Sequence, residues 1–142
     1  MIAGDEAMTT RRAACACGQL SLACEGEPLR VSVCHCTACQ HRTGSVFGVA
    51  ARYARETVTI AGEAAEYVRI GDEGNEIVFR FCPNCGSTVC WEMPAFADGI
   101  AVALGAFADP GFTPPPSRSI YDASRGHAWV ELKPDGPLER RG

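Results

Sequence analysis

The chain has 142 residues, of which 46% are hydrophobic and 21% charged, and its formal net charge is −4. The length predicts one domain, the composition is that of folded globular chains rather than disordered ones, and no apolar run reaches the roughly 18–20 residues of a membrane span. The acidic balance argues against a nucleic-acid partner, because proteins that bind nucleic acids usually carry an excess of Lys and Arg. We therefore expect neither nucleic acid nor a membrane as a partner.

Residues 1–12 are expected to form a flexible N-terminal tail, since they lack the apolar segment of a secretory signal, and residues 13–142 to form a single domain. Short runs of alternating or β-branched residues predict strands at 20–24, 29–33, 46–50, 58–60, 67–70, 77–81, 88–91 and 100–104, and a late strand at Trp129. One helical turn is predicted at 37–42, and the proline-rich segment 109–116 is expected to be an extended loop. The pattern thus indicates a mainly β protein with about eight to ten short strands.

Cysteine is the unusual residue of this sequence, with nine copies. An odd number cannot pair completely within one chain, and without a secretory signal we expect a reducing compartment, the cytoplasm. Clustered cysteines there are more often metal ligands than disulfides. Seven of the nine fall in three motifs, Cys15-Ala16-Cys17-Gly18, Cys34-His35-Cys36-Thr37-Ala38-Cys39 and Cys82-Pro83-Asn84-Cys85-Gly86. The other two, Cys24 and Cys90, lie in strand-like runs and are expected in the core.

The first and third motifs supply two sulfurs each, which is the number that one tetrahedral zinc ion needs. We predict a structural site of Cys15, Cys17, Cys82 and Cys85 that joins the N-terminal strand to a distant turn. A redox role for the C-x-x-C pair is the alternative, because that motif alone is ambiguous. No βαβ pattern surrounds the pair, which favours the metal site.

The middle motif supplies three thiolates, Cys34, Cys36 and Cys39, within six residues. Three protein ligands and one free position are typical of catalytic zinc. His41, two residues further on, is the obvious residue to fill the fourth position and turn the site into a structural one. His35 is less suited, because the cysteines on both sides of it point inward. The residues alone leave both alternatives open.

The chain resembles the family of glutathione-dependent formaldehyde-activating enzymes, which also contains centromere protein V. The resemblance rests on the three motifs in this order and on their flanks, Arg42, Gly44, Gly62, Tyr67, Arg80-Phe81, Ser87 and Trp129, and it covers about residues 13–138. It implies a β-tent fold, in which zinc staples small antiparallel sheets together. It also implies one zinc on the C-x-C and C-x-x-C pairs, and a second zinc on Cys34, Cys36 and Cys39 with an open position.

The activity implied by the resemblance is that of a carbon–sulfur lyase. In the synthetic direction, glutathione and formaldehyde combine to S-hydroxymethylglutathione at the three catalytic cysteines. Glutathione carries carboxylates, and arginine is the side chain that binds such groups in pairs of hydrogen bonds. Arg42 and Arg80 flank the cysteine motifs and are therefore the predicted binding residues for this small thiol.

One position departs from the family pattern. Members often carry a histidine before an isoleucine in the strand that follows the proline loop, whereas this chain has Ser119-Ile120. His127 is the remaining histidine that could replace it. A second hypothesis is therefore a non-catalytic scaffold, stabilised by zinc, that binds a protein partner. An open position on the second metal predicts the enzyme, and His41 on that metal predicts the scaffold. The sequence makes no prediction about oligomeric state.

Overall fold

The computed structural model describes residues 9–142, and most of the predicted tail, residues 1–8, lies outside the described residues. Within the described residues, the tail prediction is wrong for residues 10–12, because β1 (Thr10–Ala14) already pairs there with β2 (Ser21–Glu25). Arg11 explains the difference. Its guanidinium donates a hydrogen bond of 3.0 Å to Glu27 and lies 4.2 Å from the ring centre of Phe112, so both charge and packing fix this segment.

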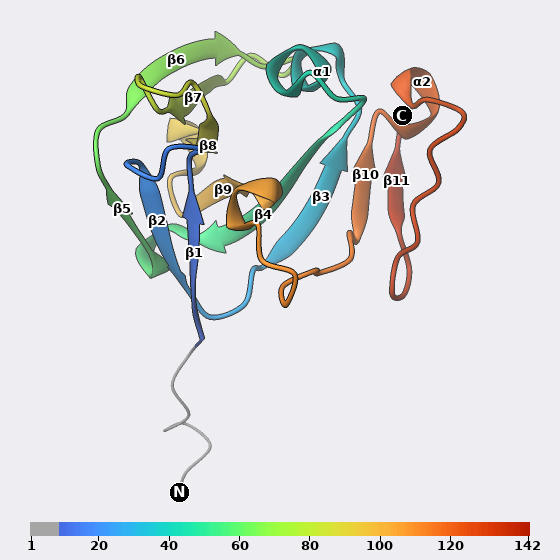
Figure 1. Cartoon of the computed structure of the whole chain (residues 1–142). Helices are drawn as coiled ribbons and strands as arrows, with labels where there is room; N and C mark the ends of the chain where they lie inside the picture. The colour runs from blue at the N-terminus through green and yellow to red at the C-terminus, as the bar shows by residue number, and fades with distance from the viewer. Residues whose placement is uncertain (1–8) are drawn as a thin grey trace, which may run out of the picture.

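The strands form a small sheet and a large sheet (Figure 1). The small sheet is antiparallel with the order β1-β2-β5, where β5 is Val58–Ala61. The large sheet has the order β11-β10-β3-β4-β9-β8-β7-β6. Its strands are β3 (Arg30–Cys34), β4 (Gly48–Ala54), β6 (Ala65–Ile70), β7 (Glu76–Phe81), β8 (Thr88–Glu92), β9 (Gly99–Ala103), β10 (Arg118–Ile120) and β11 (Glu139–Arg141). Among the described strands, parallel pairing occurs only at β10, with β3 on one side and β11 on the other.

Short helices join the strands. The α-helices are α1 (Thr37–Thr43) and α2 (Asp122–Arg125), and the 3₁₀ turns are η2 (Arg55–Thr57), η3 (Pro94–Phe96) and η4 (Leu104–Phe107). In the described part of the chain, no helix combines the length and the apolar character needed to cross a membrane. Because the helices are short, the hydrophobic core is built mainly from strand residues.

The hydrophobic core lies where the small sheet packs on one face of the large sheet. It contains Leu22 and Cys24 from β2, and Val102 with Cys90 from the neighbouring strands β9 and β8, all fully buried. The predicted core positions of Cys24 and Cys90 are thus confirmed.

The mainly β architecture is confirmed, with most strands near their predicted ranges. The late strand predicted at Trp129 is wrong, because a turn closed by a hydrogen bond from Val130 N–H to the His127 carbonyl occupies that segment and leaves Trp129 75% exposed. The predicted loop 109–116 is irregular as expected. The short strands β10 and β11 were not predicted, because three residues are too few to show an alternating pattern.

Candidate metal centre

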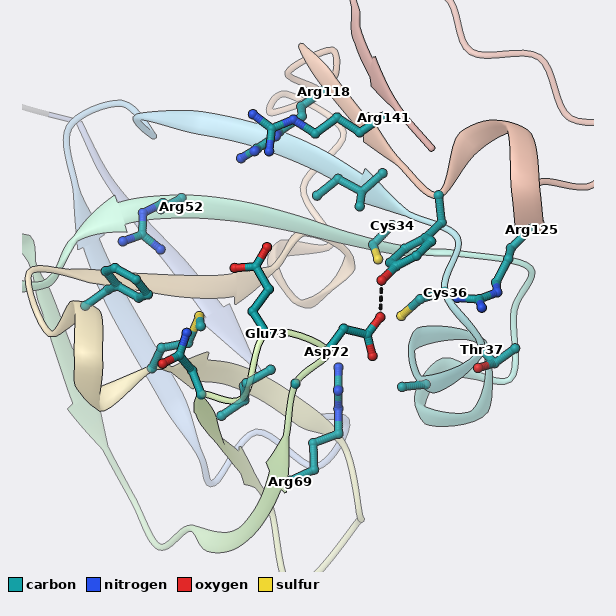
Figure 2. Close-up of a pocket in the computed structure, with 18 of the residues that line it drawn as sticks. Cys34, Cys36, Thr37, Arg52, Arg69, Asp72, Glu73, Arg118, Arg125 and Arg141 are labelled. Carbon is teal, nitrogen blue, oxygen red and sulfur yellow. Dashed lines mark hydrogen bonds between the residues drawn. The ribbon is translucent and has the colours of Figure 1, made fainter.

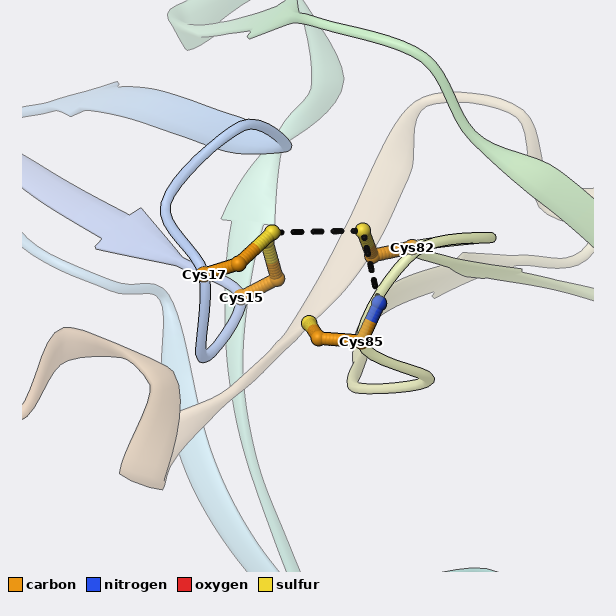
Figure 3. A group of neighbouring side chains, drawn as sticks. All are labelled: Cys15, Cys17, Cys82 and Cys85. Atoms are coloured by element: carbon orange, nitrogen blue, oxygen red, sulfur yellow. Dashed lines mark hydrogen bonds between the residues drawn. The ribbon is translucent and has the colours of Figure 1, made fainter.

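The first thiol group, which we call the four-thiol cluster, consists of Cys15, Cys17, Cys82 and Cys85 (Figure 3). The first two lie in the turn between β1 and β2, and the last two in the turn between β7 and β8. Their sulfur atoms all lie within 4.8 Å of one another, and the Sγ–Sγ distances are 3.6 Å from Cys15 to Cys17 and 3.7 Å from Cys17 to Cys82. The predicted set is therefore brought together, and it could hold one metal ion.

Hydrogen-bond donors surround the four-thiol cluster. The backbone N–H of Leu20 donates to Cys15 Sγ at 3.3 Å, and the side-chain amide of Gln19 donates to Cys82 Sγ at 3.1 Å. The Ser87 hydroxyl lies 3.4 Å from Cys85 Sγ, and its hydrogen bond, together with those of the Ser87 and Cys17 backbone, lowers the pKa of Cys85 to about 5. These donors stabilise thiolates, which is the form that binds a metal.

The second group, the three-thiol cluster, is built locally from Cys34, Cys36 and Cys39. Cys34 is the last residue of β3, and Cys36 is the N-cap of α1, where its sulfur accepts a hydrogen bond of 3.3 Å from Cys39 N–H. The turn from strand to helix therefore points all three sulfurs at one point, with every pair within 4.8 Å. No His, Asp or Glu of residues 9–142 joins this set.

The thiols of the three-thiol cluster differ in their pKa values. Hydrogen bonds that its sulfur accepts, that from Cys34 foremost, together with the charge of Arg42 lower the pKa of Cys39 to about 5 despite burial. The same hydrogen bond raises the pKa of Cys34, and burial acts in the same direction. The metal-free cluster thus keeps one thiolate, on Cys39, stabilised by a nearby cation.

Arg42 reaches this place because β4 begins with a glycine. The guanidinium of Arg42 lies 4.2 Å from the ring centre of Trp91. A Cβ atom at Gly48 would come within 2.6 Å of Arg42 Nη2 and 3.4 Å of Cys39 Cβ. Any larger residue at Gly48 would therefore displace the Arg42 guanidinium, whereas Cys39 would be in ordinary contact with it.

The three-thiol cluster borders a cavity of about 650 Å³, which we call the main cavity (Figure 2). Cys34 and Cys36 lie in its wall, and on one side Tyr121 donates a hydrogen bond to Asp72. This contact links the turn before α2 to the loop between β6 and β7. Six arginines of the described chain also line the cavity, namely Arg30, Arg52, Arg69, Arg118, Arg125 and Arg141. Sequence motifs did not predict them, because five lie on separate strands and Arg125 lies on α2, and they share no spacing signal.

The departure from the family pattern, Ser119, has a defined structural role. It is fully buried, its hydroxyl donates to Asp122 Oδ1 at 2.6 Å, and its oxygen lies 3.1 Å from Nε2 of the buried His35. Because the hydroxyl proton goes to Asp122, His35 must supply the proton of the second bond. Burial lowers the pKa of His35 against the opposing charge of Asp122. His35 is thus held away from the thiols, and His127 packs instead against Trp129.

The other predicted site residues lie in different places. His41 is exposed on α1, outside the set of mutually close sulfurs, so the fourth ligand considered for the three-thiol cluster is not in place. Arg80 donates to Glu92 and lies 3.6 Å from Glu66, so its charge is balanced by carboxylates of the protein. Of the two predicted substrate-binding arginines, only Arg42 lies beside a thiol cluster.

Comparisons with known proteins agree with this geometry. A family model described as glutathione-dependent formaldehyde-activating enzyme matches residues 10–124. A crystal structure of a Rhodobacter sphaeroides protein, described as a Northeast Structural Genomics target, superposes with a TM-score of 0.54 at 19% identity. The match covers 72% of this chain and 91% of the other. This likeness shows the fold alone. No curated protein matches the chain.

Proposed function

The chain belongs to the family of glutathione-dependent formaldehyde-activating enzymes, and from this premise we propose that it is a zinc-dependent carbon–sulfur lyase acting on an adduct of glutathione or a similar small thiol. In the synthetic direction the thiol sulfur bonds to the carbonyl carbon of formaldehyde. The carbonyl π bond breaks, and the thiol proton ends on the oxygen. S-hydroxymethylglutathione then contains every atom of the two reactants, so no further co-reactant is needed.

The observation that carries this proposal is the position of the three-thiol cluster. Cys34 and Cys36 border a cavity of about 650 Å³, a size typical of small-molecule sites, whereas the residues described here offer no fourth His, Asp or Glu to close the cluster. A metal with three protein ligands beside a cavity is the arrangement of catalytic rather than structural sites.

The donor sets fit zinc. A tetrahedron with Zn–S bonds of about 2.3 Å has sulfur–sulfur edges of about 3.8 Å. The separations of 3.6 and 3.7 Å in the four-thiol cluster are close to that value. We propose one structural zinc on Cys15, Cys17, Cys82 and Cys85, and one zinc on Cys34, Cys36 and Cys39. The second zinc would supply a position at which a thiol is acidified or a carbonyl oxygen polarised.

The chain's own residues contribute binding and orientation. Arg42 beside Cys39 and the arginines of the main cavity offer guanidinium groups to the carboxylates of the substrate. The Tyr121–Asp72 contact joins two segments of the cavity wall, the turn before α2 and the loop between β6 and β7. We further propose that the two sheets form the β-tent of the family, with the four-thiol cluster holding them together.

The scaffold hypothesis has less support. It requires a fourth protein ligand at the three-thiol cluster, and His41, the candidate for that role, is exposed and lies outside the cluster. We therefore prefer the enzyme.

Calorimetric titration of zinc-loaded protein tests the proposal. Glutathione should bind, with affinity rising as the pH approaches the pKa of its thiol, because thiolate is the soft ligand that zinc accepts. S-Methylglutathione, which has no ionisable thiol, is the matched control. Equal binding of the two would refute sulfur recognition at the cluster, and absence of binding at millimolar glutathione would leave the scaffold as the better hypothesis. Formaldehyde consumption with and without glutathione then tests the reaction itself.

A further inference from the structure

One face of the large sheet carries Arg30, Arg52, Arg118 and Arg141, which we call the arginine cluster. Arg30 on β3 is directly opposite Arg52 on β4. Arg118 on β10 is opposite Ser32, two residues after Arg30. Residues two apart on a strand share a face, and so do cross-strand partners, so these side chains lie on the face of Cys34.

The fourth arginine extends the same face by one strand. Arg141 on β11 is opposite Ile120 of β10, which is in turn opposite Cys34. Figure 2 shows Arg52, Arg118 and Arg141 at the main cavity together with Cys34 and Cys36. The arginine cluster and the three-thiol cluster therefore lie along one cavity wall.

The charges of the arginine cluster are poorly balanced by the protein. Glu139 lies 2.6 Å from Arg141 Nε and 3.6 Å from Arg118 Nε, and Asp98, 92% exposed, lies 3.9 Å from Arg52. Glu139, which is half-exposed, thus lies near two of the four guanidinium groups, and Asp72 and Glu73 also line the cavity. In addition, the direct cross-strand pairing of two arginines is destabilising. An arrangement that costs stability in this way is typical of a binding site.

Arg118 gives the most specific indication. Its side chain is only 14% exposed, and the separation of 3.6 Å from Glu139 is too long for a hydrogen bond. Its Nε atom is buried without a hydrogen-bond partner among residues 9–142. Burial, followed by the charges of Arg118 and Arg52, also lowers the pKa of Arg30, as expected for like charges crowded together. An acceptor from outside the described chain would satisfy both Arg118 and the excess charge.

We infer that the arginine cluster binds a phosphate ester at the far end of the thiol ligand. A phosphate monoester brings a charge of about −1.5 to −2 and three acceptor oxygens, and arginine forks bind it in pairs of hydrogen bonds. A carboxylate of glutathione brings one negative charge. Half of the twelve arginines of a chain with net charge −4 line this cavity, so the positive charge is local and not a general property of the protein.

The strand register sets the length of this ligand. Cys34 and Arg30 are four residues apart on β3, which corresponds to about 13 Å at 3.3 Å per residue. The thirteen bonds between the sulfur and phosphorus of 4′-phosphopantetheine span about 15 Å when extended, on the scale of three such bonds per residue length. A thiol of this class reaches both clusters. Binding of the thiol sulfur rests on the proposed function, whereas the phosphate site is inferred from the arginines alone.

A matched pair of ligands tests the inference on zinc-loaded protein. 4′-Phosphopantetheine and pantetheine differ only in the phosphate, and we expect the former to bind at least about tenfold more tightly, a ratio that shrinks with added salt. Arg118→Gln should reduce the ratio to near one without changing pantetheine affinity. Lys133→Gln is the control, because Lys133 is exposed and outside the cavity wall, and the ratio should stay as in the unchanged protein.

Two further measurements separate this inference from the proposed function. Inorganic phosphate should bind the protein without any thiol, and Arg30→Gln or Arg118→Gln should abolish that binding while leaving the folded protein at least as stable to urea, because like-charge repulsion is relieved. If phosphate binds and neither thiol does, the anion site stands and the lyase proposal fails. If phosphate does not bind, or both thiols bind equally and independently of Arg118, the inference is wrong, whatever the activity.

Discussion

The four-thiol and three-thiol clusters use the same side chain in opposite ways. In the four-thiol cluster, Cys17 and Cys82 touch across 65 positions of sequence, from the turn of the small sheet to a turn of the large sheet. In the three-thiol cluster, six consecutive residues supply every sulfur. One cluster therefore depends on the tertiary fold, and the other depends on a single strand-to-helix turn.

This difference determines what each metal can do. Bringing distant segments together costs chain entropy. A metal that binds only the folded state stabilises that state and so offsets this cost. A metal on a local turn closes only a short loop, so its loss changes the fold less. The same local site can leave a position free towards a cavity. We therefore expect the four-thiol cluster to stabilise the fold and the three-thiol cluster to carry the chemistry.

Cys82→Ser should have the largest effect, because it removes a buried ligand that joins the two sheets. Metal-coupled folding energy is on the order of 10 kcal/mol in small zinc domains, which is comparable to the whole free energy of unfolding of a typical domain, about 5–15 kcal/mol. We expect insoluble or unfolded protein by circular dichroism. Cys24→Ala is the control, since Cys24 is equally buried but belongs to neither cluster, and it should cost on the order of 1–3 kcal/mol. A soluble Cys82→Ser protein with unchanged melting would remove the structural role.

Cys36→Ser should remove one of the two metal equivalents and keep the fold. Serine is a good N-cap, so the helix start that Cys36 provides for α1 is preserved. Metal analysis with circular dichroism measures both parts of the prediction. Cys36→Ala loses the cap as well, and should be about 1 kcal/mol less stable than Cys36→Ser at the same metal content. Global unfolding of Cys36→Ser would mean that both clusters are structural.

The sequence predicted the clusters well for a physical reason. Metal-ligand spacing within a turn is a local property, so each motif could be identified from the sequence, and the pairing of the first and third motifs followed from the four ligands that zinc needs. The core positions of Cys24 and Cys90 followed from their place in strand-like runs and from the tendency of free cysteine to be buried. The fourth-ligand question stayed open, because the direction of His41 on α1 depends on how the helix sits against the sheet.

The arginine cluster could not be predicted from the sequence. Arg30, Arg52, Arg118 and Arg141 come from four strands, and only the register of β3, β4, β10 and β11 places them on one face. The parallel pairing of β10 arises from long-range packing and leaves no trace in a three-residue strand. For the same reason Arg80, which lies beside a cysteine motif in sequence, pairs with Glu92 rather than facing the thiols.

Cys24 and Cys90, which belong to neither cluster, show the effect of burial on the pKa of a cysteine. Burial raises the pKa of Cys24 and of Cys90 to about 11, from 9.0 when unfolded. Between pH 9 and pH 11 the unfolded chain therefore loses protons that the folded protein keeps, so stability falls as the pH rises through this window. Urea unfolding of zinc-loaded protein should show a loss on the order of 1 kcal/mol near pH 10. Cys24→Ala and Cys90→Ala should each flatten the slope, and an unchanged slope would contradict the assigned cause.

Arg42→Gln should produce the smallest effect and sharpens the comparison at the three-thiol cluster. There a hydrogen bond from Cys34 and the charge of Arg42 lower the pKa of Cys39 to about 5. At the four-thiol cluster, hydrogen-bond donors stabilise the thiolates instead. Removing the positive charge disfavours the thiolate, so the pKa of Cys39 should rise, by about one unit or less for a partly solvated cation. The alkylation rate of Cys39 in metal-free protein, followed by peptide mass spectrometry against pH, should shift to higher pH. Arg42→Lys keeps the charge and should restore most of the profile. If Arg42→Gln and the unchanged protein give the same profile while Arg42 still packs on Trp91, the thiols alone set the charge of the cluster.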